Sequence, residues 1–496
     1  DVRFNVIRWT PSGRQNAMGP AVVDPRSGEV ISSHAIFWHD VLRLVETWYF
    51  TQVSPLNPKA QKLPLPDDVI GDMLRYVVAH EIGHALGLRH NFKGHSAYSV
   101  AQLRNRDWTK KWGTSASIMD YARLNYVAQP GDGAYLLPKF GPYDFFAIEW
   151  GYRSFSSGMS CDDEWPYLDE LAARQIDEPM LRFGGEDDFA TLDPGVNTNV
   201  VGADPIEAAE MGLRNIDRVM PLLVPATTKR GGDYVRLRDM YQSLMVQRYR
   251  ELSAVAKIVG GVEETRYQAG RGKLPFQSVA PERQRAAVKF LLDKAWTTPR
   301  ALLDPDVLRR IGPAGGADAL QGANAQLLRQ ILEPNVFQRM AEARQAQPSG
   351  KGYIGMDLLT DLNDGLFREL QAKAPVIELY RREVQRNYVT LLLVATGTTN
   401  DPMGTSTSID MKRLLDDGSI HQSKNAFLMK QTLTSPLADV AKEYRRERGR
   451  PSEFRSSLRS GVSHLYAKID EALKRAKDAE TVAHLRDLRS ELAKVP

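Results

Sequence analysis

Residues 80–90 of the chain read His80-Glu81-Ile82-Gly83-His84-Ala85-Leu86-Gly87-Leu88-Arg89-His90. Histidines four positions apart on a helix project from one face, about one turn apart, so both rings can bind the same metal ion. A glycine after the helix can adopt a positive φ and turn the chain back, which brings a third histidine to that ion. The spacing therefore predicts that His80, His84 and His90 bind one zinc ion, with Gly87 as the turn residue.

The three predicted ligands leave a reactive position on the metal. Three neutral imidazoles leave the fourth position of zinc open to water, as in catalytic sites. Bound zinc lowers the pKa of that water to about 7 and polarises a carbonyl group. Glu81 follows His80 directly, so we expect its carboxylate beside the metal, where it acts as a general base. We favour this interpretation over a satisfied cluster of core histidines because the whole pattern is present.

The residues before the motif indicate where it lies in the fold. Asp67 and Asp68 are expected to supply N-cap chemistry for a helix that ends at Gly87. Another helix is expected over Asp40–Gln52. Strands are expected at Val2–Trp9 and Glu29–Trp38, which are rich in β-branched and aromatic residues. The apolar stripe of the motif helix consists of Val69, Met73, Val77, Val78, Ile82 and Leu86.

A second segment downstream reads Ser117-Ile118-Met119-Asp120-Tyr121. Together with the motif at 80–90, it resembles the Met-turn of the metzincin metallopeptidases. The resemblance implies that Met119 forms a hydrophobic floor beneath the three imidazoles. It also implies that Tyr121, which matches a tyrosine of the astacin-like and serralysin-like branches, binds zinc or stabilises the tetrahedral oxyanion. The alternative role for Tyr121 is that of a buried aromatic residue, and His95 is expected to be a solvated loop histidine.

The resemblance extends over about residues 2–152. Segments Asn16–Pro20, Val23–Gly28 and Asn125–Gly131 are similar to the large bacterial metzincin-like zinc-dependent metalloproteases with an extended helical C-terminal region. Asn91, after the third histidine, matches none of the best-known branches. Because only 79 residues precede His80, an N-terminal segment is expected to have been removed or to form a separate chain. The resemblance alone implies an extracellular or periplasmic location.

The expected fold class is α+β, with a small mixed sheet and the zinc-site helix followed by a predominantly helical region. We predict a metzincin-like catalytic domain at 1–152, a loop-rich connection at 153–232, a helical domain at 233–395, a linker at 396–408 and a helical segment at 409–496. Tyr143–Trp150 resembles the helix that closes metzincin catalytic domains. Further helices are expected at Tyr234–Val259, Glu282–Trp296, Ala317–Leu332, Asn335–Gln345, Val376–Ala395 and Glu453–Ala476.

Composition restricts the classes of partner. The 496 residues include 65 Lys and Arg against 61 Asp and Glu, a net charge of +4 that is too dilute for a nucleic-acid binder. No stretch approaches the roughly 18 consecutive apolar residues of a membrane span. The single cysteine, Cys161, excludes an internal disulfide. The acidic run Glu186-Asp187-Asp188, with Asp193 and Asp204 nearby, offers oxygen ligands for Ca²⁺, but its irregular spacing favours a solvated loop.

These features predict a zinc-dependent endopeptidase whose peptide or protein substrate lies extended along an edge strand, Glu29–Trp38. One alternative is a metal-bearing binding or scaffold protein with a blocked cleft, although the intact Glu81 argues against it. Another is a zinc hydrolase that acts on a non-peptide amide. Chelator-sensitive cleavage of an unstructured protein distinguishes the peptidase from the binding protein.

Overall fold

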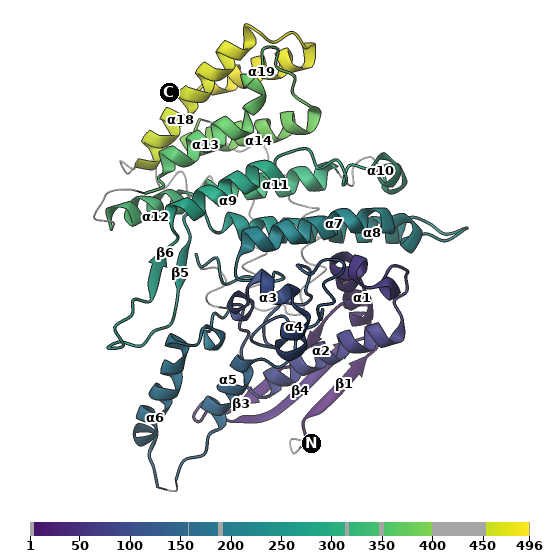
Figure 1. Cartoon of the computed structure of the whole chain (residues 1–496), viewed down its shortest axis with the longest axis vertical. Helices are drawn as coiled ribbons and strands as arrows, with labels where there is room; N and C mark the ends of the chain where they lie inside the picture. Colours follow the sequence, from purple (N-terminus) through teal and green to yellow (C-terminus); the bar gives the residue numbers. More distant parts are fainter. Residues whose placement is uncertain are drawn as a thin grey trace. The chain divides into compact units, whose positions relative to one another are not determined.

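The computed structural model describes residues 4–156, 158–186, 192–312, 317–346, 352–398 and 453–495. Contacts between residues divide the chain into two compact units. Among the described residues, the first unit comprises those up to 254 and 263–277, and the second comprises 255–262 and those from 278 onward. Small sheets and many helices confirm the α+β class (Figure 1). The division into five segments stays a prediction, because two units defined by contacts do not test its boundaries.

The larger sheet belongs to the first unit. It has the order β1-β4-β2, and β3 also pairs with β4. β1 is parallel to β4, whereas β2 and β3 are antiparallel to it, with a register shift at Val22/Val23. These strands are β1 (Val6–Thr10), β2 (Ala17–Met18), β3 (Ala21–Val23) and β4 (Val30–Trp38).

β4 occupies the centre of this sheet, which corrects one prediction. β1 pairs with one side of β4, and β2 and β3 pair with the other. From His34 to Trp38, β4 therefore has β1 on one side, and β2 and β3 follow its other side from Val30 to Phe37. The prediction that Glu29–Trp38 is an edge strand that accepts a peptide is wrong.

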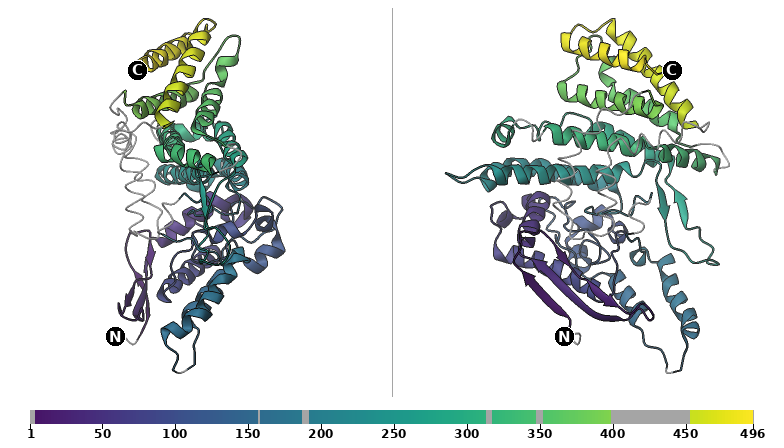
Figure 2. Two further views of the ribbon diagram at one scale, coloured as in Figure 1. Left: turned by 90° about the vertical axis from the view of Figure 1, so that its left-hand side faces the viewer. Right: turned by 180° about the vertical axis from the view of Figure 1, so that it is seen from behind.

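The motif helix, α2 (Asp67–Ala85), packs against the sheet and against α1 (Val41–Val53). Figure 2 shows the sheet on one side of α2. The N-cap position of α2 is Pro66, so the expected capping by Asp67 or Asp68 is wrong. Both aspartates lie instead in the first turn, where the helix dipole favours negative charge. The interface between sheet and helices buries Ala17, Ala35, Phe37, Leu44, Met73 and Val77.

Further helices complete the first unit. The helix expected at Tyr143–Trp150 is present as α5, and the range 153–232 contains two helices, α6 and α7, in addition to loops. Asp204 caps α7 by accepting the N–H groups of Ile206 and Glu207. The helices are α3 (Val100–Arg104), α4 (Arg106–Trp112), α5 (Pro142–Tyr152), α6 (Cys161–Ala173), α7 (Pro205–Thr227) and α8 (Val235–Ala256). Short 3-10 helices lie at Ser54–Leu56, Pro58–Ala60, Gly94–Ala97, Arg174–Ile176 and Pro179–Leu181.

The second unit is predominantly helical. The six helices expected between 234 and 476, of which α8 lies mostly in the first unit, are present, each within three residues of its predicted limits. Thr396 ends α14, and the rest of the predicted linker at 396–408 lies largely outside the described residues. No helix in the described ranges is long and apolar enough to cross a membrane. β5 (Val262–Glu264) and β6 (Phe276–Ser278) pair with each other and lie mostly in the first unit. The other helices of the second unit are α9 (Pro281–Lys294), α10 (Pro305–Ile311), α11 (Ala317–Ile331), α12 (Pro334–Gln345), α13 (Gly355–Leu366), a 3-10 helix (Arg368–Gln371), α14 (Leu379–Thr396), α18 (Glu453–Leu473) and α19 (Ala479–Leu492).

Candidate metal centre

The end of α2 determines where the third histidine lies. The N–H of Leu88 donates to the Gly83 carbonyl at 3.0 Å, and the N–H of Gly87 donates to the His84 carbonyl at 2.9 Å. These are the two bonds of a Schellman motif, whose left-handed residue is usually glycine. Gly87 occupies that position with φ +83°. The chain therefore turns away from the helix and returns to its histidine-bearing face.

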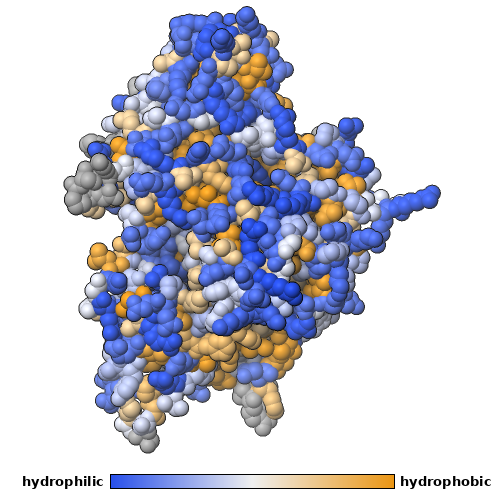
Figure 3. Space-filling model, viewed as in Figure 1, coloured by the Kyte–Doolittle hydropathy of each residue, from blue (hydrophilic) through white to orange (hydrophobic). Residues whose placement is uncertain are grey.

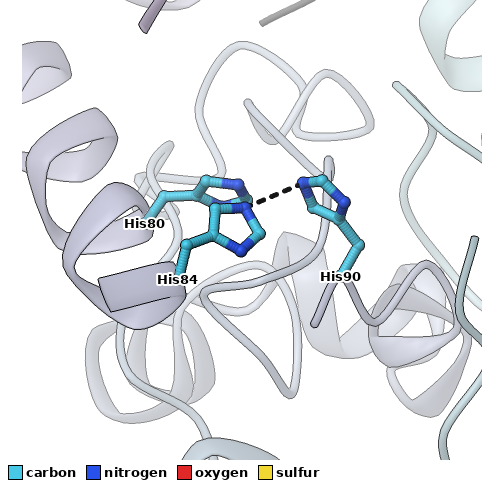
Figure 4. A group of neighbouring side chains, drawn as sticks. All are labelled: His80, His84 and His90. Atoms are coloured by element: carbon cyan, nitrogen blue, oxygen red, sulfur yellow. Dashed lines mark hydrogen bonds between the residues drawn. The ribbon is translucent and has the colours of Figure 1, made fainter. Parts of the chain in front are cut away.

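Three imidazoles converge beside this turn. Figure 4 shows His80 and His84 on the helix and His90 on the following segment, with their rings directed toward one another. One ring nitrogen of each residue lies within 4.8 Å of the others. The Nε2 atoms of His84 and His90 are 3.1 Å apart. Two nitrogens bound about 2.0 Å from one tetrahedral zinc ion lie about 3.3 Å apart, so this donor set fits the ion.

The Nδ1 atom of each histidine has its own partner. His80 Nδ1 is 2.8 Å from the Ile118 carbonyl, and His84 Nδ1 is 2.9 Å from the Leu88 carbonyl. Since a carbonyl oxygen only accepts, Nδ1 carries the hydrogen in both rings, and Nε2 keeps its lone pair for a metal. His90 Nδ1 bonds the Glu186 carboxylate instead. Burial lowers the pKa of His84, which favours the neutral ring that a metal requires.

Glu81 lies on the same helix in a fully buried position. Burial raises the pKa of its carboxyl to about 8, so Glu81 holds a proton at neutral pH unless a nearby cation stabilises the carboxylate. Gly19, directly after β2, lies against this part of α2. A Cβ atom at Gly19 would be 2.6 Å from the Glu81 carbonyl oxygen and 2.9 Å from His84 Cβ. The edge of the sheet thus approaches the motif at a point where only glycine fits.

The Met-turn segment supports the motif at several points. Met119 is fully buried, and its carbonyl accepts the N–H of Asn91 at 3.1 Å. A Cβ atom at Gly83 would lie 2.2 Å from Met119 Sδ, so the thioether packs directly on the backbone between the two helical histidines. The Ile118 carbonyl, as described, holds His80. Sequence reasoning missed the role of Gly83, although a glycine inside a helix is itself a signal of close packing.

A pair of glycine variants tests this packing. Gly83→Ala is expected to destabilise the metal-free protein by about 1–3 kcal/mol, because the buried Met119 side chain has to move. Gly71→Ala is the matched control in the same helix, because a Cβ atom there meets nothing within 4 Å. It is expected to stabilise the helix by about 0.5–1 kcal/mol. Denaturant unfolding in the presence of a chelator measures both effects, and equal stabilities of the two variants would contradict the packing.

Tyr121 lies among the rings of the site. Its ring centroid is 5.5 Å from that of His80 and 4.7 Å from that of His90. The side chain packs with Phe92 and Val196, and burial raises its pKa well above the ordinary value. Its buried hydroxyl makes no hydrogen bond to any of the residues that the structure describes. Tyr121 is thus both an aromatic neighbour of the histidines and a neutral donor that has no acceptor within the described ranges.

Comparison with known proteins identifies the family. A family model described as Met-zincin matches residues 62–374, which is more than half of the chain and includes the motif, the Met-turn and α5. The chain belongs to the Met-zincin family. No curated protein and no solved structure matches it. Membership confirms the resemblance to the metzincins and implies a hydrolase of the zinc metalloprotease type.

His95 occupies a buried position behind the Met-turn of this Met-zincin, so the prediction that it is a solvated loop histidine is wrong. His95 is 1% exposed, and its Nδ1 lies 3.0 Å from Asp120 Oδ2. The same oxygen accepts the N–H of His95 at 2.6 Å and the Ser115 hydroxyl at 2.8 Å. Asp144 of α5 accepts the Ser117 hydroxyl and the N–H of Ile118. These carboxylates, which sequence reasoning missed, connect the Met-turn to its neighbours.

The acidic residues considered for Ca²⁺ have other partners in the Met-zincin structure. Asp193 forms a buried ion pair with Lys93, and Asp204 caps α7. Glu186 bonds His90. Asp187 and Asp188 lie outside the described residues. The described acidic residues therefore do not support a calcium site.

Proposed function

We propose that this chain is a zinc-dependent endopeptidase that holds the ion with His80, His84 and His90 and uses Glu81 as its general base. The observation that supports this most is the convergence of three imidazole nitrogens, together with the buried carboxyl of Glu81 on the helix that carries two of the histidines. The Met-zincin match supports the class of hydrolase. An extracellular or periplasmic location belongs to the same proposal and rests on the resemblance.

The protein groups divide the chemistry among them. When bound, zinc supplies a water of lowered pKa and polarises the scissile carbonyl. Glu81 takes the proton of the attacking water and passes it to the leaving amine. In this proposal Tyr121 donates its phenolic hydrogen to the developing oxyanion, and the lack of an acceptor for its hydroxyl among the described residues supports that role. Met119 and Gly87 hold the ligands in place.

The edge formed by β2 and β3 is our proposed position for an extended substrate. Both strands pair with β4 on one side, and among the described strands neither has a partner on its other side. Gly19 lies between them against Glu81 and His84. A peptide that adds to this edge by backbone hydrogen bonds would therefore pass next to the predicted base.

The surface around α2 and α5 also favours a peptide or protein substrate. Figure 3 shows apolar surface over this part of the first unit. Exposed apolar residues of the two helices include Ile82, Phe145 and Trp150, and Leu86 follows α2 directly; each is more than 40% exposed. Clustered exposed apolar side chains are typical of surfaces that contact another protein. This favours a polypeptide over a small non-peptide amide.

Metal removal tests the proposal directly. Dialysis against a chelator is expected to abolish cleavage of an unfolded protein such as denatured casein, and one equivalent of Zn²⁺ is expected to restore it. Magnesium or calcium added in place of zinc is the control and is expected to restore nothing, because both prefer oxygen ligands. Cleavage that persists without metal would refute the peptidase proposal. A zinc-loaded chain that cleaves no protein would favour the binding role instead.

A further inference from the structure

His90 differs from the other two predicted ligands in its Nδ1 partner. His80 bonds the Ile118 carbonyl of the Met-turn, and His84 bonds the Leu88 carbonyl within the motif itself. His90 instead bonds the carboxylate of Glu186, which lies 96 positions later in the chain. The His90 ring is 2% exposed, whereas the Glu186 side chain is 29% exposed. The ring is thus fixed inside the protein by a charged group that reaches it from the surface side.

Asn91 holds the segment that carries Glu186. Its side chain is fully buried and uses both of its polar ends. The amide nitrogen donates to the Arg182 carbonyl at 3.0 Å, and the amide oxygen accepts the N–H of Gly184 at 3.1 Å. The residue directly after the third histidine thus attaches the backbone two and four positions before Glu186.

Two glycines allow the close approach of this segment. A Cβ atom at Gly184 would lie 2.6 Å from Val196 Cγ2 and 3.0 Å from Lys93 Cβ. One at Gly185 would lie 2.6 Å from the Phe183 ring and 3.5 Å from the His90 carbonyl oxygen. The backbone therefore passes directly along the loop of the third histidine. This close approach of residues 184 and 185 brings Glu186 to the His90 ring.

We infer that Glu186 is a positioning residue for His90 and that Asn91 holds the backbone that brings Glu186 to the ring. This inference rests on the proposed zinc site. The carboxylate accepts the Nδ1 hydrogen of His90, which leaves the Nε2 lone pair directed toward His84 Nε2. A carboxylate behind a histidine ligand fixes the ring orientation and increases its basicity more than a carbonyl does. The role of Asn91, which matches none of the best-known metzincin branches, is to hold the 182–184 backbone next to His90.

Zinc affinity measures the effect of Glu186 independently of catalysis. Competition with a chromogenic chelator is expected to show about 10- to 100-fold weaker zinc binding by Glu186→Ala. Glu186→Gln is expected to lie between Glu186→Ala and the parent, because the amide oxygen still accepts the hydrogen but lacks the charge. Glu178→Gln is the control, because that side chain is half exposed and, among the residues that the structure describes, forms an ion pair only with the exposed Arg174. It is expected to bind zinc like the parent.

Two further readouts separate positioning from a structural role. In the presence of a chelator, all four proteins are expected to unfold at the same temperature. With Co²⁺ in place of zinc, the visible absorption bands of Glu186→Ala are expected to differ from those of the parent. Parental zinc affinity in Glu186→Ala would overturn the inference, and so would equal destabilisation of the metal-free Ala and Gln variants. If the parent chain itself bound no zinc, the proposed function would fail instead.

Variants of Asn91 test independently whether it acts on zinc binding through Glu186. Asn91→Ala removes both side-chain bonds to the 182–184 segment and is expected to weaken zinc binding by about the same factor as Glu186→Ala. If Asn91 acts through Glu186, the double variant is expected to bind zinc no more weakly than either single variant. Additive losses of zinc affinity in the double variant would contradict the inference that Asn91 acts through Glu186.

Discussion

Glu81→Gln is expected to keep zinc and to lower kcat/KM for peptide hydrolysis by about 100- to 10,000-fold. Glutamine has nearly the same shape as glutamate and fits the same buried position, but it cannot take a proton from water. The zinc ligands are unchanged, so metal content should match that of the parent. A fluorogenic peptide assay, with zinc content measured on the same preparation, gives both quantities.

Glu251→Gln is the matched control for Glu81→Gln. Glu251 of α8 is also a buried carboxyl, and burial raises its pKa to about 8, as for Glu81. It hydrogen bonds Gln247 and is not part of the histidine cluster. The control variant is expected to hydrolyse peptides like the parent. If Glu81→Gln hydrolysed peptides as fast as Glu251→Gln, Glu81 would not be the general base.

The local part of the site could be predicted from the sequence because its geometry depends on neighbours in the chain. The spacing of His80 and His84 follows from the helix period, and the positive φ of Gly87 follows from the helix end. The structure brings these residues together with His90, while metal binding itself stays a proposal. The longer helices followed their apolar periodicity for the same reason.

The non-local part could not be predicted, because no pattern along the chain identifies partners far apart in sequence. The β-branched and aromatic content of Glu29–Trp38 predicts a strand but does not say whether it lies at an edge, and β2 has only two residues. His95 and Asp120 are 25 positions apart, and His90 and Glu186 are 96 apart. Each pair is visible only after the fold has brought its segments together.

His90→Ala is expected to weaken zinc binding by at least about 100-fold, because losing a ligand costs more than losing its supporting partner. Unfolding measurements show this without any substrate. With zinc at 1,000 times its Kd, the parent gains about 4 kcal/mol in free energy of unfolding, whereas a 100-fold weaker variant gains only about 1.4 kcal/mol. His464→Ala, an exposed position on α18, is the control and should keep the full gain. An undiminished gain in His90→Ala would show that His90 is not a zinc ligand. It would contradict the three-histidine site on which the proposed hydrolysis depends.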